Sequence, residues 1–149
     1  MDNPQLKLDN QICFPLYSVS RLITKAYKPY LDKMNVTYPQ YLVLMILWEN
    51  DGITVNEISK KLFLNTNTLS PLLKRMETLE VLDRTRSAED ERKVIVKLTQ
   101  KGNNLQEEAA SIPSELIKVL AHENTNLNDV LQLKDILNQW IKVLSDDKK

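Results

Sequence analysis

Cysteine and histidine each occur only once in this 149-residue chain, at Cys13 and His122. A single cysteine excludes a disulfide within the chain, and one residue of each kind excludes a clustered Cys/His zinc site. The one histidine falls in a predicted polar connection, which excludes a Ser-His-Asp triad for nucleophilic catalysis. We therefore expect no metal centre, no cofactor and no enzyme.

Glycine is scarce as well, since Gly52 and Gly102 are the only two. A loop that cradles phosphate groups needs several closely spaced glycines, so this kind of nucleotide site is excluded. No uncharged segment reaches 18 residues, and the start, "MDNPQLKLDN", has no basic stretch followed by an apolar run. We expect a cytoplasmic protein without a membrane partner.

The rest of the composition is that of an ordinary soluble globular protein, with 42% hydrophobic and 27% charged residues. The length predicts a single domain, residues 1–149. The net charge of zero conceals an asymmetry, because residues 54–101 carry ten Lys and Arg against seven Asp and Glu, and the remainder ten against thirteen. A locally basic segment can contact a polyanion even when the whole chain is neutral.

The spacing of apolar residues predicts a series of helices in the first half of the chain. The first begins near Ile12 and ends near "KPYLDKMN", where Pro29 discourages helix through Lys28. Two capping boxes, at Thr37 and Thr54, begin the next two helices. Asn65 caps a fourth, "NTNTLSPLLKRMETLEVL", whose polar first turn is left exposed.

The pattern then changes to two alternating stretches, "LDRTR" and "KVIVKL", which predict a two-stranded ribbon around a charged loop. Thr99 caps a helix that runs toward Pro113, and "NDVLQLKDILNQWIKVL" is a last amphipathic helix. The fold class is mainly α with a small β-ribbon. Helix, turn, helix and wing is a DNA-reading arrangement, here over residues 54–101, in which the second helix enters the major groove.

The two ends of the chain, residues 1–36 and 102–149, carry more apolar helical surface than a small winged domain can cover. We expect these helices to pack against a second copy, which places two reading helices about 34 Å apart, one turn of DNA. A homodimer of this kind binds an inverted repeat in double-stranded DNA. The alternative is that the same helices only complete the core of a monomer.

The single cysteine lies in "QICFPLY", and all five tyrosines follow within 28 residues of it. Phenols are hydrogen-bond donors, and a thiol reacts as thiolate, which donors and the positive end of a helix stabilise. The alternative is that Cys13 is a small buried hydrophobic residue and that the tyrosines pack with satisfied hydroxyls. Packing is the expected role of Tyr30 and Tyr41.

A resemblance to the MarR family of regulators covers nearly the whole chain and is carried by three segments: "QICFPLYSVSRLITKAYKPYLDKMNVTYPQYLVLMILWE", "LSPLLKRMETL" and "DERKVIVKLTQKG". The cysteine followed by tyrosines in "AYKP" and "TYPQY" resembles the organic-hydroperoxide-sensing branch, OhrR. The resemblance implies a homodimeric winged-helix repressor that binds an inverted-repeat operator when reduced. Oxidation by organic hydroperoxides releases it.

The resemblance also implies the residues of the sensor. Cys13 is the redox-sensing thiol, and Tyr27 and Tyr38, with Tyr17 nearby, donate hydrogen bonds to its thiolate across the dimer. The thiolate attacks the O–O bond of the peroxide and becomes a sulfenic acid. Because the chain has no second cysteine, an outside small thiol, a backbone nitrogen or further oxidation must capture oxidised Cys13.

The same resemblance implies DNA contacts at the start of the reading helix, further along it, and in the wing: Thr66, Asn67, Thr68, Ser70, Arg75, Asp90 and Arg92. Short hydroxyl and amide side chains can approach phosphates and base edges, and a loop arginine suits the minor groove. The alternative for Arg92 is a solvated charge paired with Asp90 or Glu91. Both interpretations hold if Asp90 orients Arg92.

The chain departs from the branch at two places. Asn65 and Asn67 stand where the branch often has an acidic residue and a glycine, so a different operator preference is expected. Pro15 stands where the branch usually has an ordinary apolar residue, and proline disfavours helix at Phe14. We expect the thiol to lie on a separate short turn.

Other functions remain to be distinguished. A thiol peroxidase also uses a lone reactive cysteine, but the predicted elements offer no helix-sheet scaffold around Cys13. A second alternative is a MarR-type regulator that senses a small aromatic ligand in the dimer pocket, with Cys13 incidental. A third is a winged-helix module that binds a protein, which a DNA-binding measurement would distinguish.

Overall fold

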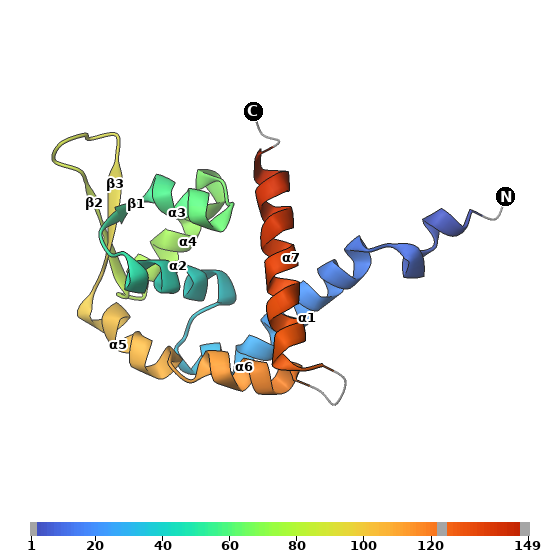
Figure 1. Cartoon of the computed structure of the whole chain (residues 1–149). Helices are drawn as coiled ribbons and strands as arrows, with labels where there is room; N and C mark the ends of the chain where they lie inside the picture. Colours follow the sequence, from blue (N-terminus) through green and yellow to red (C-terminus); the bar gives the residue numbers. More distant parts are fainter. Residues whose placement is uncertain (1–2, 122–124, 147–149) are drawn as a thin grey trace. The chain divides into compact units, whose positions relative to one another are not determined.

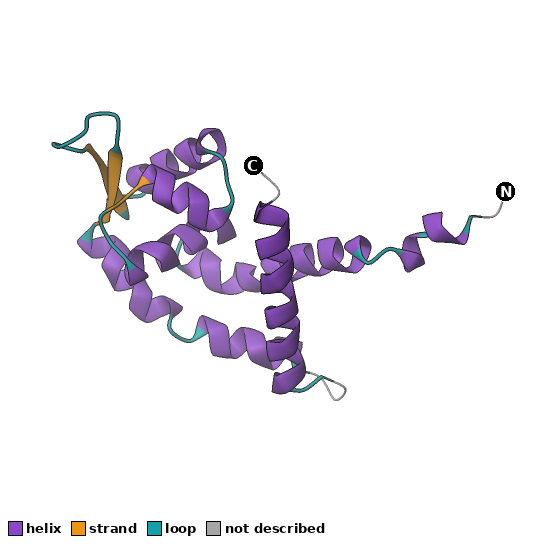
Figure 2. Ribbon diagram, turned by 45° about the horizontal axis from the view of Figure 1, so that its top comes forward, coloured by secondary structure: helices purple, strands orange, loops and turns teal. Residues whose placement is uncertain are grey.

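The computed structural model describes residues 3–121 and 125–146, so His122 lies outside the described residues (Figure 1). The chain forms two compact units, Met1–Ala110 and Ser111–Lys149. The first unit holds most of the helices and the small sheet, and the second is helical (Figure 2).

The element order matches a winged helix preceded by two long helices. After two 3-10 turns at Pro4–Leu6 and Leu8–Asn10, the first unit contains α1 (Cys13–Lys33), α2 (Tyr38–Glu49), β1 (Ile53–Thr54), α3 (Val55–Leu62), α4 (Thr66–Thr78), β2 (Leu82–Arg86), β3 (Val94–Leu98) and α5 (Gln100–Ala109). The second contains α6 (Ile112–Leu120) and α7 (Leu127–Asp146). The prediction of a mainly α fold with a small β-ribbon is confirmed.

Helix α1 ends at Lys33, within the predicted segment "KPYLDKMN", but it continues through Lys28 and Pro29, so the expected break at Lys28 is wrong. The proline removes one backbone donor, but the turn beyond it buries Leu31 and Met34, which are 2% and 5% exposed. A salt bridge of 2.8 Å between Lys28 and Asp32 also spans the proline. Burial beyond the proline outweighs the local preference against helix.

The beginning of α1 also differs from the prediction. Cys13 is its first residue, and Pro15 lies in its first turn. The first backbone N–H groups of a helix have no partner within it, so a proline there costs no hydrogen bond. The expected separate turn around the thiol is therefore wrong, and the sulfur lies at the positive end of a 21-residue helix.

Local capping signals are confirmed at all four predicted helix starts, because each depends only on neighbours three residues apart. The hydrogen bonds are Thr37 N–H to Gln40 Oε1 at 2.8 Å, Thr54 N–H to Glu57 Oε2 at 2.8 Å, Thr68 N–H to Asn65 Oδ1 at 2.8 Å, and Gly102 N–H to Thr99 Oγ1 at 3.1 Å.

The predicted ribbon is confirmed as the antiparallel pair β2 and β3, with Leu82 opposite Leu98. The sequence did not reveal β1, which pairs with the other edge of β3 in a sheet of order β1-β3-β2. A two-residue strand has no periodicity to detect. Helix α6 was also missed, because Pro113 was interpreted as a helix end although it lies in the first turn of α6.

The core of the first unit surrounds α2, which is apolar on nearly every side. Fully buried side chains of α2 and of the neighbouring helices and sheet form this core: Val43, Leu44, Leu47, Ile58, Leu69, Leu73, Met76, Leu82 and Val96. Among residues 3–121 and 125–146, no helix combines the length and the apolar character needed to span a bilayer.

The base of the wing is joined to α5 by close backbone packing at Gly102. A Cβ atom on Gly102 would lie 2.0 Å from the carbonyl oxygen of Val81, far inside contact distance. The same carbonyl accepts a hydrogen bond from Thr99 N–H at 3.2 Å, and the indole of Trp48 donates to Gly102 O at 3.0 Å. Gly102 therefore lies where α2, α5 and the wing meet.

Substituting Gly102 tests this junction. Gly102→Ala should lower the free energy of unfolding by about 1 to 3 kcal/mol, because the methyl group must displace backbone at Val81. Asn103→Ala, at an exposed position of the same helix, should change it by less than about 0.5 kcal/mol. Urea denaturation at one fixed protein concentration measures both, and a fully stable Gly102→Ala variant would contradict the packing.

Candidate nucleic-acid interface and thiol site

The start of α4 presents a polar turn to solvent. Thr66, Asn67, Thr68 and Ser70 are exposed, whereas Leu69 between them is completely buried. This division follows from the helical period, which turns one residue inward and leaves its polar neighbours outside. Arg75, also exposed, lies further along the same helix.

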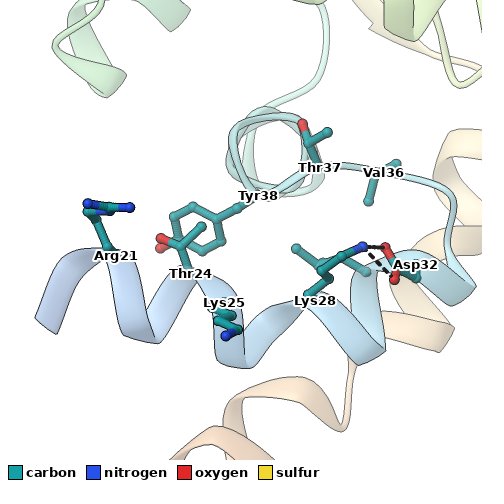
Figure 3. Close-up of a pocket in the computed structure, with 9 residues that line it drawn as sticks. Arg21, Thr24, Lys25, Lys28, Asp32, Val36, Thr37 and Tyr38 are labelled. Carbon is teal, nitrogen blue, oxygen red and sulfur yellow. Dashed lines mark hydrogen bonds and ion pairs between the residues drawn. The ribbon is translucent and has the colours of Figure 1, made fainter. Parts of the chain in front are cut away.

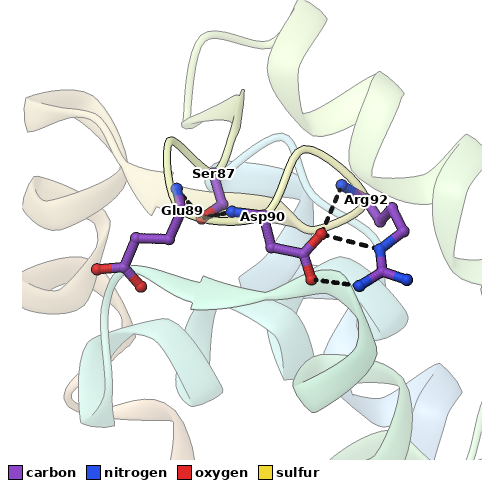
Figure 4. Close-up of polar contacts among 4 residues, drawn as sticks. All are labelled: Ser87, Glu89, Asp90 and Arg92. Atoms are coloured by element: carbon purple, nitrogen blue, oxygen red, sulfur yellow. Dashed lines mark hydrogen bonds and ion pairs between the residues drawn. The ribbon is translucent and has the colours of Figure 1, made fainter.

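The loop of the wing holds a paired arginine. The Arg92 guanidinium donates to both carboxylate oxygens of Asp90, at 3.0 and 3.3 Å, and the Arg92 backbone N–H donates to the same carboxylate at 3.1 Å (Figure 4). These hydrogen bonds lower the pKa of Asp90. The Arg92 side chain nevertheless remains 90% exposed, so it is both paired and available to a ligand.

The loop that carries this pair is itself ordered by Ser87. Its hydroxyl accepts hydrogen bonds from the backbone N–H groups of Glu89 and Asp90, at 3.3 and 3.4 Å (Figure 4). The loop closes where Ser87 N–H donates to the carbonyl of Lys93 at 2.9 Å. Side-chain turns of this kind replace the glycine that a tight loop often needs.

A depression of about 190 Å³ brings the wing and the reading helix together. It is lined by Thr54, Val55, Asn56, Ser70, Arg84, Arg92, Lys93 and Val94. Of the residues predicted to bind DNA, only Ser70 and Arg92 line it, and the other five lie outside it. Sequence reasoning missed Arg84, which forms a 2.6 Å salt bridge with Glu77 and lowers the pKa of that carboxyl.

Cys13 is exposed at the start of α1. Tyr17 follows one helical turn later, and its hydroxyl accepts a 2.9 Å hydrogen bond from Arg21, whose guanidinium carbon lies 5.4 Å from the centre of the Tyr17 ring. In the described part of the chain, no cluster of three His, Cys, Asp or Glu side chains is placed to hold a metal ion.

The other two predicted sensor tyrosines are packed together far from this thiol. The ring centres of Tyr27 and Tyr38 lie 4.8 Å apart, and Tyr41 lies 5.9 Å from the first and 6.5 Å from the second. Fourteen residues of continuous helix separate Cys13 from Tyr27, which at 1.5 Å per residue is about 21 Å. The structure therefore does not bring Cys13 to these phenols within one protomer.

The aromatic cluster continues to the base of the wing. Tyr41 contacts Trp48 edge-on, with 6.2 Å between their ring centres, and Trp48 donates the hydrogen bond to Gly102 described above. Sequence reasoning assigned Tyr41 to packing, and it is 3% exposed. The role of Trp48 was missed, because it depends on a contact with a residue 54 positions away.

The rings of Tyr27 and Tyr38 are half-buried, but their hydroxyls are open. No described residue forms a hydrogen bond with either hydroxyl, and no buried side-chain oxygen in the described part lacks a partner. Burial, with a further contribution from the neighbouring phenols at Tyr27 and Tyr41, raises the pKa of all three clustered tyrosines. They remain protonated donors at neutral pH.

The raised pKa values predict a late ionisation. Burial favours the neutral phenols, so their contribution to stability is present below pH 10 and is lost as the pH rises through the higher folded values. Absorbance at 295 nm should show part of the tyrosine signal titrating later in the native protein than in urea. Tyr27→Phe should remove one phenol from this late fraction, and superimposable native and denatured curves would contradict the packing.

Comparison with known proteins identifies the relatives of this chain. The family model of the transcriptional regulators SarA/Rot matches residues 25–109. The organic hydroperoxide resistance transcriptional regulator of Bacillus subtilis (strain 168) is 45% identical over 139 residues, which cover 93% of this chain and 92% of that protein.

Two solved structures of AbfR, a protein of Staphylococcus epidermidis, are similar over the whole fold. Reduced AbfR bound to DNA is 38% identical with a TM-score of 0.79, and overoxidised AbfR bound to DNA is 37% identical with a TM-score of 0.76. Each comparison covers 97% of this chain and 99% of the AbfR chain.

These relatives are DNA-binding regulators, which confirms the prediction that the chain is not an enzyme. The extent and identity of the matches also confirm the resemblance found in the sequence. The chain belongs to the MarR family of winged-helix transcriptional regulators, in its organic hydroperoxide resistance branch.

Proposed function

We propose that this protein is a redox-sensing transcriptional repressor of the cytoplasm, which binds an inverted-repeat operator as a homodimer and leaves it when organic hydroperoxides oxidise Cys13. The proposal rests on a reactive group and its hydrogen-bond donors, which lie on the same chain but too far apart to meet within it. An exposed cysteine begins α1, and about 21 Å away two phenols hold their hydroxyls open.

These two features require a second copy. Because α1 is continuous, Cys13 reaches the pair Tyr27 and Tyr38 only if it comes from another protomer. Apolar side chains that could bury such an interface are exposed along α1 and α7: Phe14, Tyr17, Val19, Leu22, Leu127, Leu131, Leu133, Ile136, Trp140, Ile141, Val143 and Leu144. We assign residues 1–36 and 102–149 to dimerisation, since exposed apolar surface of this extent marks an interface.

We assign DNA recognition to residues 54–101. The polar start of α4 enters the major groove, where Thr66, Asn67, Thr68 and Ser70 contact phosphates and base edges. Arg75 contacts the backbone. Arg92 enters the minor groove with its guanidinium oriented by Asp90, which fixes its plane before binding.

The release step begins with the Cys13 thiolate, held by the phenols of the partner subunit. Thiolate attack on the peroxide gives a sulfenic acid and an alcohol, and the phenols lose their anionic acceptor. The chain has no second cysteine, so a small outside thiol forms a mixed disulfide at Cys13. AbfR binds DNA in its overoxidised form, which favours the mixed disulfide over further oxidation as the releasing state here.

The packed aromatic rings connect the oxidised Cys13 site to the DNA-binding wing. Tyr27 and Tyr38 contact Tyr41, Tyr41 contacts Trp48, and Trp48 is hydrogen-bonded to Gly102 at the base of the wing. A bulky group beside Tyr38 displaces these rings. The displacement changes the position of each wing, and with it the spacing of the two reading helices.

The wing assignment predicts a specific loss of affinity. Arg92→Ala should weaken operator binding by about 1 to 3 kcal/mol, as expected for a lost groove contact. Lys142→Ala removes the same charge from α7, outside the segment 54–101 that we assign to DNA recognition, and should have little effect. Fluorescence anisotropy with duplex from the chain's own promoter measures both, and equal affinity of the two variants would contradict the assignment.

The sensing assignment predicts a specific loss of response. Cys13→Ser should bind the operator but remain bound after cumene hydroperoxide and a small thiol are added. Tyr27→Phe and Tyr38→Phe should bind the operator and respond about tenfold more slowly, because the thiolate loses a charge-assisted hydrogen bond. Intact-mass spectrometry should show one thiol adduct in the responsive protein, and release of Cys13→Ser by peroxide would exclude the mechanism.

A further inference from the structure

A pocket of about 410 Å³ lies between α1 and the start of α2, within the first unit (Figure 3). Its volume is in the range of small-molecule sites. The lining residues are Arg21, Thr24, Lys25, Lys28, Leu31, Asp32, Val36, Thr37 and Tyr38. Tyr38 points from α2 toward Thr24 on α1, and the Lys28–Asp32 pair closes one end (Figure 3).

The charge of this pocket is strongly one-sided. Three lining residues are cationic and one is acidic, in a chain with a net charge of zero. Lys28 is neutralised by Asp32, with both carboxylate oxygens within 2.9 Å of its ammonium. Arg21 donates to the hydroxyl of Tyr17 and not to a carboxylate, and among the described residues Lys25 forms no salt bridge. Two positive charges are left for a ligand.

The position of Tyr38 connects the pocket to the redox chemistry. Its hydroxyl is one of the two that we propose to hold the Cys13 thiolate of the other protomer. A thiol that attacks oxidised Cys13 must approach beside this phenol. The pocket gives that approach a cationic wall, and thiols such as glutathione and cysteine carry carboxylates.

We propose that this pocket receives an anionic low-molecular-weight thiol, with its carboxylate facing Arg21 and Lys25 and its sulfur directed at oxidised Cys13. The inference rests on the proposed function, and it names the chemical class of the resolving thiol. Positive potential in a cleft raises the local concentration of an anion, so the pocket selects anionic over neutral thiols.

The chemistry balances without another oxidant. The peroxide O–O bond breaks as sulfur gains oxygen, which gives the sulfenic acid and an alcohol. The incoming thiol sulfur then forms an S–S bond with Cys13, the S–O bond breaks, and the thiol proton leaves with the hydroxyl group as water. The second step leaves Cys13 and the incoming thiol joined as a mixed disulfide.

A pair of thiols that differ in charge tests the inference. The protein is oxidised with one equivalent of cumene hydroperoxide and mixed with N-acetylcysteine, which is anionic, or 2-mercaptoethanol, which is neutral. Quenched intact-mass spectrometry gives the rate of each adduct. We expect the anionic thiol to react about tenfold faster at low salt, and the advantage to fall as salt screens the two charges.

Charge variants show whether the pocket is responsible. Lys25→Gln and Arg21→Gln should each bring the ratio of anionic to neutral rates closer to one, and Lys25→Glu, which leaves Arg21 and the new carboxylate with no net charge, should bring it to about one. Lys33→Gln removes an exposed charge from the same helix outside the pocket, and should keep the ratio of the unmodified protein. A ratio of one in the unmodified protein, or equal ratios in all variants, would overturn the inference.

A second measurement is independent of peroxide sensing. Reduced Cys13 is mixed with the disulfide of N-acetylcysteine or with hydroxyethyl disulfide, and thiol–disulfide exchange gives the same adducts without a sulfenic acid. The same charge preference is expected. Failure of peroxide to oxidise Cys13 would overturn the proposed function, whereas loss of the charge preference in exchange would overturn the pocket assignment alone.

Discussion

The unbroken helix α1 fixes the distance between the two parts of the proposed sensor. Its 21 residues hold Cys13 and the phenol pair about 21 Å apart, because an α-helix has a fixed rise and no break separates them. A separate turn around the thiol, as the sequence suggested, would have allowed contact within one protomer. Because α1 is unbroken, Cys13 can meet these phenols only in a second copy of the chain, which is why the sensor that we propose belongs to a dimer.

The second determinant is the apolar helix α2, which connects the proposed sensor with the proposed DNA-binding wing. Its first turn carries Tyr38, its middle buries Tyr41, and its last turn carries Trp48, which reaches Gly102 at the base of the wing. Protein interiors are close-packed and have little empty space to absorb an added group. A group inserted beside Tyr38 should therefore shift the neighbouring rings. Gly102 on α5 packs so closely against Val81 that no Cβ fits between them. A shift of the rings that moves α5 should therefore also move the base of the wing.

The sequence predicted the features that depend on near neighbours. The cap at Asn65 and the polar turn after it were predicted because each depends on a few adjacent residues. The alternating strands of the wing were predicted for the same reason. The effect of Pro29 on α1 was misjudged because burial of the residues beyond it stabilises the helix. Strand β1 was missed because it forms only by pairing with the distant strand β3. For the same reason the cationic pocket, which brings α1 and α2 together, was not foreseen, and the roles of the sensor residues stay predictions.

Mixed dimers show directly whether Cys13 and the phenols of Tyr27 and Tyr38 come from different protomers. Heterodimers are prepared from one Cys13→Ser subunit with intact tyrosines and one subunit that keeps Cys13 but carries Tyr27→Phe and Tyr38→Phe. The rate of cumene hydroperoxide oxidation is then followed by intact-mass spectrometry. We expect the remaining Cys13 to react as fast as in the unmodified dimer, and a rate as slow as that of the double Phe homodimer would contradict phenols supplied by the other protomer.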